Sequence, residues 1–250
     1  EIPSFPAWNG QQDIVSAQRG GEDEADKQWR KFEENIGLYP IMKDFPARKG
    51  TSRLSAYLSA GCISPRVLAT KAAGQGADAW LDNLIRRDFY QQFAYHRARI
   101  EPESDAESAP FSDDLTEHWR QGETGFPLID AAMRSLKSSG WLHPALRSLT
   151  AEFLCGILHQ PSEHGIDWFA AQQTDFDPAL NEGNWQTAAR NPRRRSIDII
   201  QTARRLDPDG TFVRRHIPEL AHLPANLVHT PWLASSEIDA HGYPPPVVAP

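Results

Sequence analysis

The sequence predicts an all-α protein, and two observations lead to this fold class. Apolar residues recur at the three- and four-residue spacing of amphipathic helices through most of the chain. No stretch alternates strands with helices in the way that a parallel sheet requires. Only residues 197–200 have the β-branched composition of a strand, and the pattern there is weak.

Three helices are expected in the first hundred residues. Trp29, Phe32 and Ile36 share one face of the first helix, and Gly37 is placed to end it. Ser64-Pro65 favours the start of a second helix. Asp78 is a candidate N-cap for a third. The third helix has an apolar stripe of Trp80, Leu81, Leu84, Ile85 and Phe89.

Two further helices are expected between residues 127 and 158. The stripe of the first begins at Leu128 and ends at Met133 and Leu136, with Gly140 as its stop. Pro144 suits the first turn of the second helix, which is the most apolar of the chain. Its apolar residues are Leu146, Leu149, Phe153, Leu154, Ile157 and Leu158. Loops are expected at 101–114, 190–196 and 241–250, which are rich in proline or charge.

Composition indicates a globular protein and limits its partners. The chain has 250 residues, 40% hydrophobic and 24% charged, with a formal net charge of −7. Residues 185–220 carry eight arginines against four acids, so the acidity lies elsewhere in the chain. This balance disfavours, without excluding, a protein that relies on bulk attraction to nucleic acid.

Several classes of protein are not indicated. The chain has no uncharged apolar run long enough to span a membrane. Cys62 and Cys155 are too few for a disulfide framework, which favours a reducing compartment, the cytoplasm or an organelle stroma. His159 and His164 have no third ligand at suitable spacing, so no metal site is expected.

Three segments combine residues that suit a nucleotide cofactor. In the first, Gly50-Thr51-Ser52 offers hydroxyls and backbone N–H groups beside Arg53. That combination suits a phosphate or pyrophosphate. An ordinary helix cap with a solvated arginine is the alternative interpretation.

The second and third segments suit the rest of such a ligand. A Gly-Trp-x-His corner would place Trp141 and Arg147 beside a pocket between two helices, although a core tryptophan and a surface arginine explain it too. In the third segment, Asp175, Asp177 and Asn181 precede Trp185. Their oxygens can accept from heterocycle N–H groups or ribose hydroxyls, and a capped polar turn is the alternative.

Taken together, these segments resemble the FAD-binding domain of the DNA photolyase/cryptochrome family. The motifs D-F-P-x-x-x-G-T-S-R-L-S-x-Y-L, G-x-T-G-[FY]-P-x-[IV]-D-A-A-M-R, G-W-x-H and D-x-D-x-x-x-N-x-G-x-W-Q occur in the family's order. The resemblance covers residues 25–235, with an N-terminal extension at 1–24 and a Pro-rich tail at 236–250. It implies a helical domain around a U-shaped FAD, without the family's N-terminal antenna domain.

The resemblance also implies roles for individual residues. FAD phosphates would be held by Tyr39, Thr51, Ser52, Arg53, Leu54 and Ser55. The flavin-contacting helix would supply Trp80, Asn83 and Arg87, and the isoalloxazine would be lined by Trp141, His143 and Arg147. Asp175 and Asp177 would accept from the flavin and its ribityl or ribose groups. Asn181 would face flavin N5, and Trp185 would be the proximal electron donor.

Several departures from the family pattern affect repair and photoreduction. Arg86 replaces the tryptophan that stacks on the lesion, and Asn83, Pro144 and Ala145 replace other lesion contacts. The tryptophan relay behind Trp185 reads serine at position 162, with Trp168 as the nearby ring, and lacks its distal member.

The leading hypothesis is therefore a light-responsive or redox-active flavoprotein that has lost ordinary dimer repair. Two alternatives stay open: a photolyase-type DNA repair lyase with an altered lesion pocket, and a scaffold stabilised by FAD. Weak DNA contact is expected through Arg193, Arg194 and Arg195.

Overall fold

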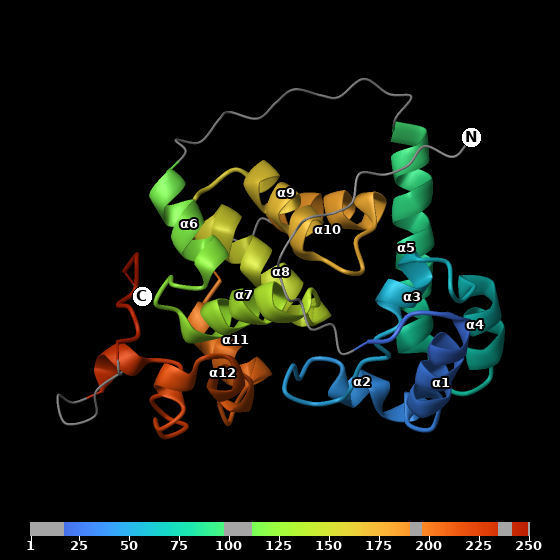
Figure 1. The fold of residues 1–250 in the computed structure, drawn as a ribbon, viewed down its shortest axis with the longest axis horizontal. Helices are drawn as coiled ribbons and strands as arrows, with labels where there is room; N and C mark the ends of the chain where they lie inside the picture. The colour runs from blue at the N-terminus through green and yellow to red at the C-terminus, as the bar shows by residue number, and fades with distance from the viewer. Residues whose placement is uncertain (1–17, 98–111, 191–196, 235–241, 250) are drawn as a thin grey trace.

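The protein is described by a computed structural model, which covers residues 18–97, 112–190, 197–234 and 242–249. These residues form helices and connecting loops with no strand (Figure 1), so the all-α prediction is confirmed. The first five α-helices are α1 Glu22–Glu33, α2 Tyr39–Met42, α3 Ser55–Ser59, α4 Pro65–Ala72 and α5 Asp78–Arg97. The others are α6 Asp113–Gln121, α7 Pro127–Ser139, α8 Pro144–Glu152, α9 Ser162–Gln172, α10 Pro178–Arg190, α11 Ile199–Leu206 and α12 Thr211–His216.

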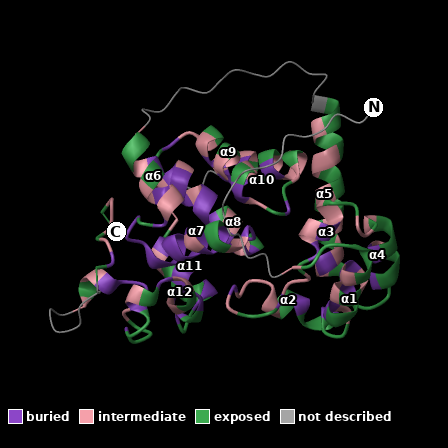
Figure 2. Cartoon of the chain, viewed as in Figure 1, coloured by how far each residue is buried: buried purple, intermediate pink, exposed green. Residues whose placement is uncertain are grey.

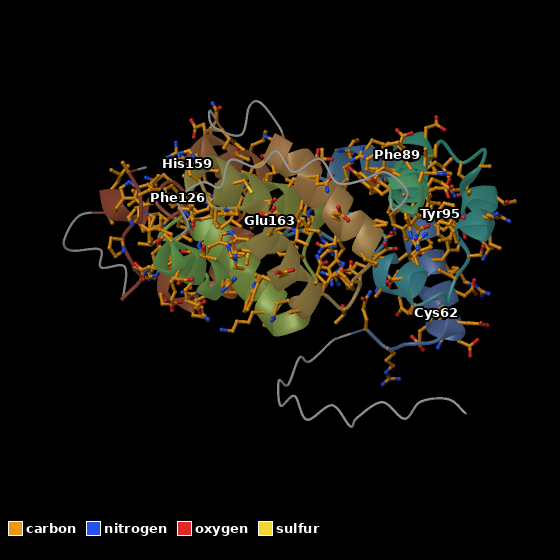
Figure 3. All side chains as sticks on the ribbon, turned by 90° about the horizontal axis from the view of Figure 1, so that it is seen from above. Cys62, Phe89, Tyr95, Phe126, His159 and Glu163 are labelled. Atoms are coloured by element: carbon orange, nitrogen blue, oxygen red, sulfur yellow. The ribbon has the colours of Figure 1, made fainter. Side chains whose placement is uncertain are left out.

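Two hydrophobic clusters organise the molecule. The smaller one gathers Trp29, Phe32, Leu68 and Trp80 from α1, α4 and the start of α5. The larger one is built around α7 and α8, and α7, in which nine of 13 residues are buried, is drawn mainly in the colour of buried residues in Figure 2. Helix α5 stands at the edge of the fold between the α1–α4 group and the helices of the larger cluster (Figure 1). Figure 3 shows the same separation, since Phe89 and Cys62 lie toward one end and Phe126 and His159 toward the other.

The corner between α7 and α8 forms as the sequence predicts. Gly140 ends α7 in the left-handed conformation with φ of 66°, which costs glycine little. Pro144 starts α8, and His143 Nδ1 accepts the Ala145 backbone N–H at 3.3 Å. After Glu152 the helix widens into a π-turn over Phe153–Ile157, so the long apolar helix expected here changes register near its end.

The structure differs from the sequence prediction in three places. The expected strand at 197–200 is wrong: Asp198 caps α11, whose Ile199, Ala203 and Leu206 are buried at helical spacing. The stripe on α5 is only half covered, because Trp80 is buried whereas Ile85 and Phe89 are 66% and 59% exposed. Helix α6 begins inside the expected loop at 101–114, of which residues 101–111 lie outside the described part.

The described tail residues 242–249 pack onto the helical body. Tyr243 is buried and donates its hydroxyl hydrogen bond to Asp130 on α7. The Val247 backbone N–H donates to Thr124 O at 2.9 Å. This packing requires glycine at position 125, since a Cβ there would lie 2.4 Å from Pro245. The end of the chain therefore holds the entry to α7 in place.

Candidate functional site

A cavity of about 280 Å³ lies where the two clusters meet, beside α5. It brings together the three segments that the sequence analysis singled out, together with α5. All sixteen predicted site residues except His143 line it: Tyr39, Thr51, Ser52, Arg53, Leu54, Ser55, Trp80, Asn83, Arg87, Trp141, Arg147, Asp175, Asp177, Asn181 and Trp185. Residues up to 146 positions apart in the sequence thus share one concave surface.

The loop before α3 supplies a cation to this cavity. Close packing shapes the loop, since a Cβ at Gly50 would lie 2.4 Å from Met42 O. Arg53 then adopts a φ of 52°, a left-handed conformation that is strained for a residue with a side chain. Its guanidinium lies 3.9 Å from the ring centroid of Trp141. Desolvation and repulsion from Arg215 lower the pKa of Arg53, so an anion would be favoured beside it.

Arg147 and Asp175 form an ion pair in the cavity wall. Arg147 Nη2 donates to Asp175 Oδ2 at 2.6 Å, and its Nε donates to Leu142 O at 2.8 Å. The Asp175 side chain is fully buried, and its Oδ1 has no hydrogen-bond partner. A buried carboxylate oxygen without a donor is costly, so a ligand N–H that reached it would stabilise the site.

Asp177 is already occupied by protein donors. Its Oδ1 accepts the backbone N–H groups of Ala179 and Leu180, which caps the start of α10. Its Oδ2 accepts from Gln91 at 2.9 Å and lies 3.5 Å from Arg87 Nη2. Asp177 therefore holds α5 against α10, and this structural role stands beside the expected ligand role.

Asn181 and Trp185 face the cavity from α10. The Asn181 Nδ2 group donates to Ile166 O at 2.9 Å, which leaves Oδ1 to accept a hydrogen bond. The Trp185 ring is buried against Phe169 at 5.1 Å and Trp119 at 6.0 Å between centroids. Gly165 on α9 permits this position, because a Cβ there would lie 2.0 Å from the Trp185 ring.

Helix α5 forms one wall of the cavity. Trp80 is buried, and Asn83 Nδ2 donates to Tyr39 Oη at 2.9 Å. A Cβ at Gly183 would lie 2.3 Å from the Tyr90 ring, so α5 and α10 approach closely along this wall. Tyr90 lines the cavity but was not predicted. Its position three residues after Arg87, on the same helical face, is the signal that could have found it.

His143 lies outside the cavity, contrary to the expectation that it lines the isoalloxazine. It is 2% exposed and packs edge-on behind Trp141, with ring centroids 6.2 Å apart. Burial, together with the charges of Arg53 and Arg147, lowers its pKa to about 4. The neutral ring caps α8, so His143 supports Trp141 from behind.

The rings around Trp185 are not the ones that the sequence analysis expected. Trp168 packs under the Arg120 guanidinium, 5.7 Å from its ring centroid. The tryptophan in contact with Trp185 is Trp119, which is fully buried and donates its Nε1–H to Thr150 O at 3.2 Å. The contact between α6 and α10 was invisible in the sequence because the two residues are 66 positions apart.

Comparison with known proteins identifies this architecture. Residues 80–250 match the family described as the FAD binding domain of DNA photolyase. The chain belongs to the DNA photolyase family. Within this family, a deoxyribodipyrimidine photo-lyase of Alkalihalophilus pseudofirmus is 36% identical over 234 residues, which are 87% of this chain and 49% of that protein. The chain thus spans about half the length of the relatives it matches.

Solved structures of the family share the fold. A class III photolyase from Agrobacterium tumefaciens superposes with a TM-score of 0.87 and 30% identity, over 99% of this chain and 56% of that one. A Synechocystis cryptochrome gives 0.84 and 28%, over 98% and 56%. The photolyase/cryptochrome helical fold is therefore shown for this chain, and the family model that it matches is that of an FAD-binding domain. None of its described helices is both long and apolar enough to cross a membrane, and its described residues form no cluster of three metal-ligating side chains.

Proposed function

We propose that the cavity binds one FAD without a covalent bond, in a photolyase-family flavoprotein that responds to light or transfers electrons. The observation that carries the proposal is the convergence of Arg53, Trp141 and the Arg147–Asp175 pair on one cavity. Bound FAD would supply light absorption and electron acceptance. The residues of this chain would bind and orient FAD and donate electrons to it.

The phosphates would lie along the loop from Thr51 to Ser55, beside Tyr39. The charge of Arg53 has no acidic partner among the described residues, so it is available to a diphosphate. The Trp141 ring is fixed at this point by its own hydrogen bond from Nε1 to Ser55 Oγ at 3.4 Å. Together they supply one cationic and one flat apolar contact for a nucleotide.

The flavin ring would lie between Trp80 and Arg87 of α5 and the side chains of α8 and α10. A small rotation of the Asp175 carboxylate would offer its unpartnered Oδ1 to a ring N–H. The free Oδ1 of Asn181 would accept from flavin N5–H. An amide has no acidic proton, so Asn181 orients the ring and does not protonate it.

Trp185 would be the immediate electron donor, because it is the tryptophan of α10 in the cavity wall. Trp119 behind it has no exposed surface. If Trp119 is oxidised, a donor in solvent cannot reduce it directly. We therefore expect photoreduction to be slow unless an external reductant approaches the flavin.

DNA repair is the second candidate function, and relatives named photo-lyase favour it. Against it stand Asn83, Arg86 and Pro144 at the cavity, where the family resemblance leads us to expect lesion contacts. The loss of a stacking ring alone weakens binding of a base by about 1–3 kcal/mol. The proposed DNA-contacting residues Arg193, Arg194 and Arg195 lie outside the described residues. If DNA repair activity persists, the chain would be a lyase of the photolyase type.

A scaffold that keeps FAD for stability is the third candidate. Cys62 and Cys155 are half-buried, and two cysteines are too few for a disulfide framework, which suits the cytoplasm or an organelle stroma.

The test is the visible spectrum of the purified chain, with the ratio of FAD to protein measured after denaturation. We expect one FAD per chain, and R53Q should lower FAD affinity more than R66Q, since Arg66 on α4 is exposed and lies outside the cavity. A protein that binds no FAD when reconstituted would overturn the proposal. A repair assay on strands that contain pyrimidine dimers then separates the lyase from the other two candidates.

A further inference from the structure

Three polar side chains connect α5 to the start of α10 at the wall of the cavity. Arg87 and Asp177 line the cavity, whereas the half-buried Gln91, one helical turn after Arg87, is not a lining residue. Gln91 Oε1 accepts a hydrogen bond from Arg87 Nη1 at 3.0 Å, and Gln91 Nε2 donates to Asp177 Oδ2 at 2.9 Å. One amide therefore contacts both the cation and the carboxylate.

Arg87 and Asp177 carry opposite charges but do not form a close ion pair. Arg87 Nη2 lies 3.5 Å from Asp177 Oδ2 and donates instead to Leu58 O at 3.3 Å. In the other pair of the cavity wall, Arg147 Nη2 and Asp175 Oδ2 are 2.6 Å apart. Because the Arg87 and Asp177 side chains are only 16% and 12% exposed, solvent screens their attraction weakly, and a close contact would be favoured. The wider separation therefore needs a restraint.

Oδ2 of Asp177 is the atom for which Arg87 and Gln91 compete. The other oxygen, Oδ1, accepts the backbone N–H groups of Ala179 and Leu180, so the side-chain donors share Oδ2. Gln91 occupies Oδ2 with its own N–H and holds Arg87 Nη1 with its carbonyl oxygen. Without that amide, a small rotation of the Arg87 side chain would bring the guanidinium onto Oδ2. The charge of a guanidinium in a close pair is compensated, and it acts less on another charge in the cavity.

We propose that Gln91 is a positioning residue: its amide keeps the Arg87 guanidinium out of a close pair with Asp177, so that the positive charge acts on the flavin. This proposal rests on the proposed FAD site. Reduction adds negative charge to the flavin, and a nearby cation stabilises that charge. Gln91 therefore raises the reduction potential of bound FAD, although it is not a lining residue of the cavity.

The experiment measures the reduction potential of bound FAD in two variants. Q91M removes the amide at nearly constant size. We expect the preference of the site for reduced over oxidised FAD to fall about tenfold in Q91M, which is a fall of about 30 mV for a two-electron couple. Q91E is nearly isosteric with glutamine and should lower the potential further, because it gives up the donor to Asp177 and adds a negative charge. Q91E carries the test if Q91M does not fold.

The matched controls are Q92M and Q92E, which make the same changes at the next residue of α5. Gln92 is exposed and is not a lining residue, so both controls should leave the potential unchanged. A second test adds Q91M to an R87Q variant. The potential should not respond to Q91M there, because the cation that Gln91 positions is gone.

Three results would overturn the role of Gln91 while FAD binding stands. They are an unchanged potential in Q91M, equal falls in Q91E and Q92E, and a full-sized fall when Q91M is added to R87Q. An unmodified chain that never binds FAD would overturn the proposed function, and the role of Gln91 with it.

Discussion

Replacing Gly165 by alanine tests whether the Trp185 ring is held in the cavity wall by close packing against α9. The added Cβ would lie 2.0 Å from Cη2 and 2.3 Å from Cζ3 of Trp185, far inside contact distance. Trp185 is 2% exposed and packs on Phe169 and Trp119, so it has no free space behind it. The ring must therefore shift toward the cavity or the helices must separate.

The magnitude follows from two opposing effects. Overpacking of a filled core costs about 1–3 kcal/mol. Alanine in place of glycine in a helix returns at most about 1 kcal/mol. We expect the free energy of unfolding to fall by about 0–3 kcal/mol. A flavin that loses its ring contact with Trp185 should bind about threefold to tenfold more weakly, since aromatic contacts contribute about 0.5–1.5 kcal/mol.

The assay measures urea unfolding and FAD affinity for G165A and for the matched control G37A. A Cβ at Gly37 meets nothing within 4 Å, so the control makes the same chemical change in open space. The reasoning would be refuted if G165A were more stable than the unmodified chain and bound FAD with full affinity.

Three further predictions concern the interior. W119F should leave FAD content unchanged but lower the yield of flavin photoreduction, measured by transient absorption, because Trp119 is the tryptophan in contact with Trp185. An unchanged yield in W119F, with a loss in W168F, would favour the relay through Trp168. Burial raises the pKa of Asp130 to about 6, so the folded chain favours the protonated carboxyl. The stability that this protonation contributes is present below pH 4 and is lost as pH rises through 6. Above that pH, Y243F should cost about 1.5–3 kcal/mol in urea unfolding, the contribution of a hydrogen bond to a charged group, and a smaller cost at pH 7 than at pH 4 would contradict this. The lowered pKa of His143, about 4, acts in the opposite direction: its contribution is present above pH 6.5 and is lost as pH falls toward 4. H143N keeps a capping side chain that does not titrate in this range. Its free energy of unfolding should therefore fall less steeply between pH 6.5 and 4, by up to about 1.4 kcal/mol per pH unit, which is the effect of one proton. An identical slope in both proteins would refute the assignment.

Local signals in the sequence were sufficient for the helices whose ends are fixed locally. Gly140 and Pro144 mark the corner between α7 and α8, and the structure has both boundaries there. The prediction failed at 197–200, where three isoleucines favoured a strand but Asp198 capped a helix. That outcome depends on burial of Ala203 and Leu206, which the four-residue pattern did not include.

The candidate site shows the same division between local and distant information. Most of the predicted residues that line the cavity lie in short motifs. The contact of Trp119 with Trp185 was missed because the two residues are distant in the sequence. His143 lies behind Trp141 because its ring caps the start of α8. Glycine weakens a helix by its intrinsic propensity, yet Gly165 and Gly183 each accommodate a ring from another helix.

The position of the cavity between two hydrophobic clusters would give FAD a structural role in this chain as well as a chemical one. Direct contacts across the cavity are polar: Ser59 Oγ donates to Phe176 O at 2.5 Å, and Arg87 lies 3.5 Å from Asp177. Such contacts contribute about 1 kcal/mol each, so a ligand that touches both walls would add to the stability of the folded chain in proportion to its affinity. A scaffold function therefore needs only the binding residues, such as Arg53 and Arg147. A redox function also needs Trp185 at the flavin. If W185F keeps FAD but loses electron transfer, the chain has a redox function beyond that of a scaffold.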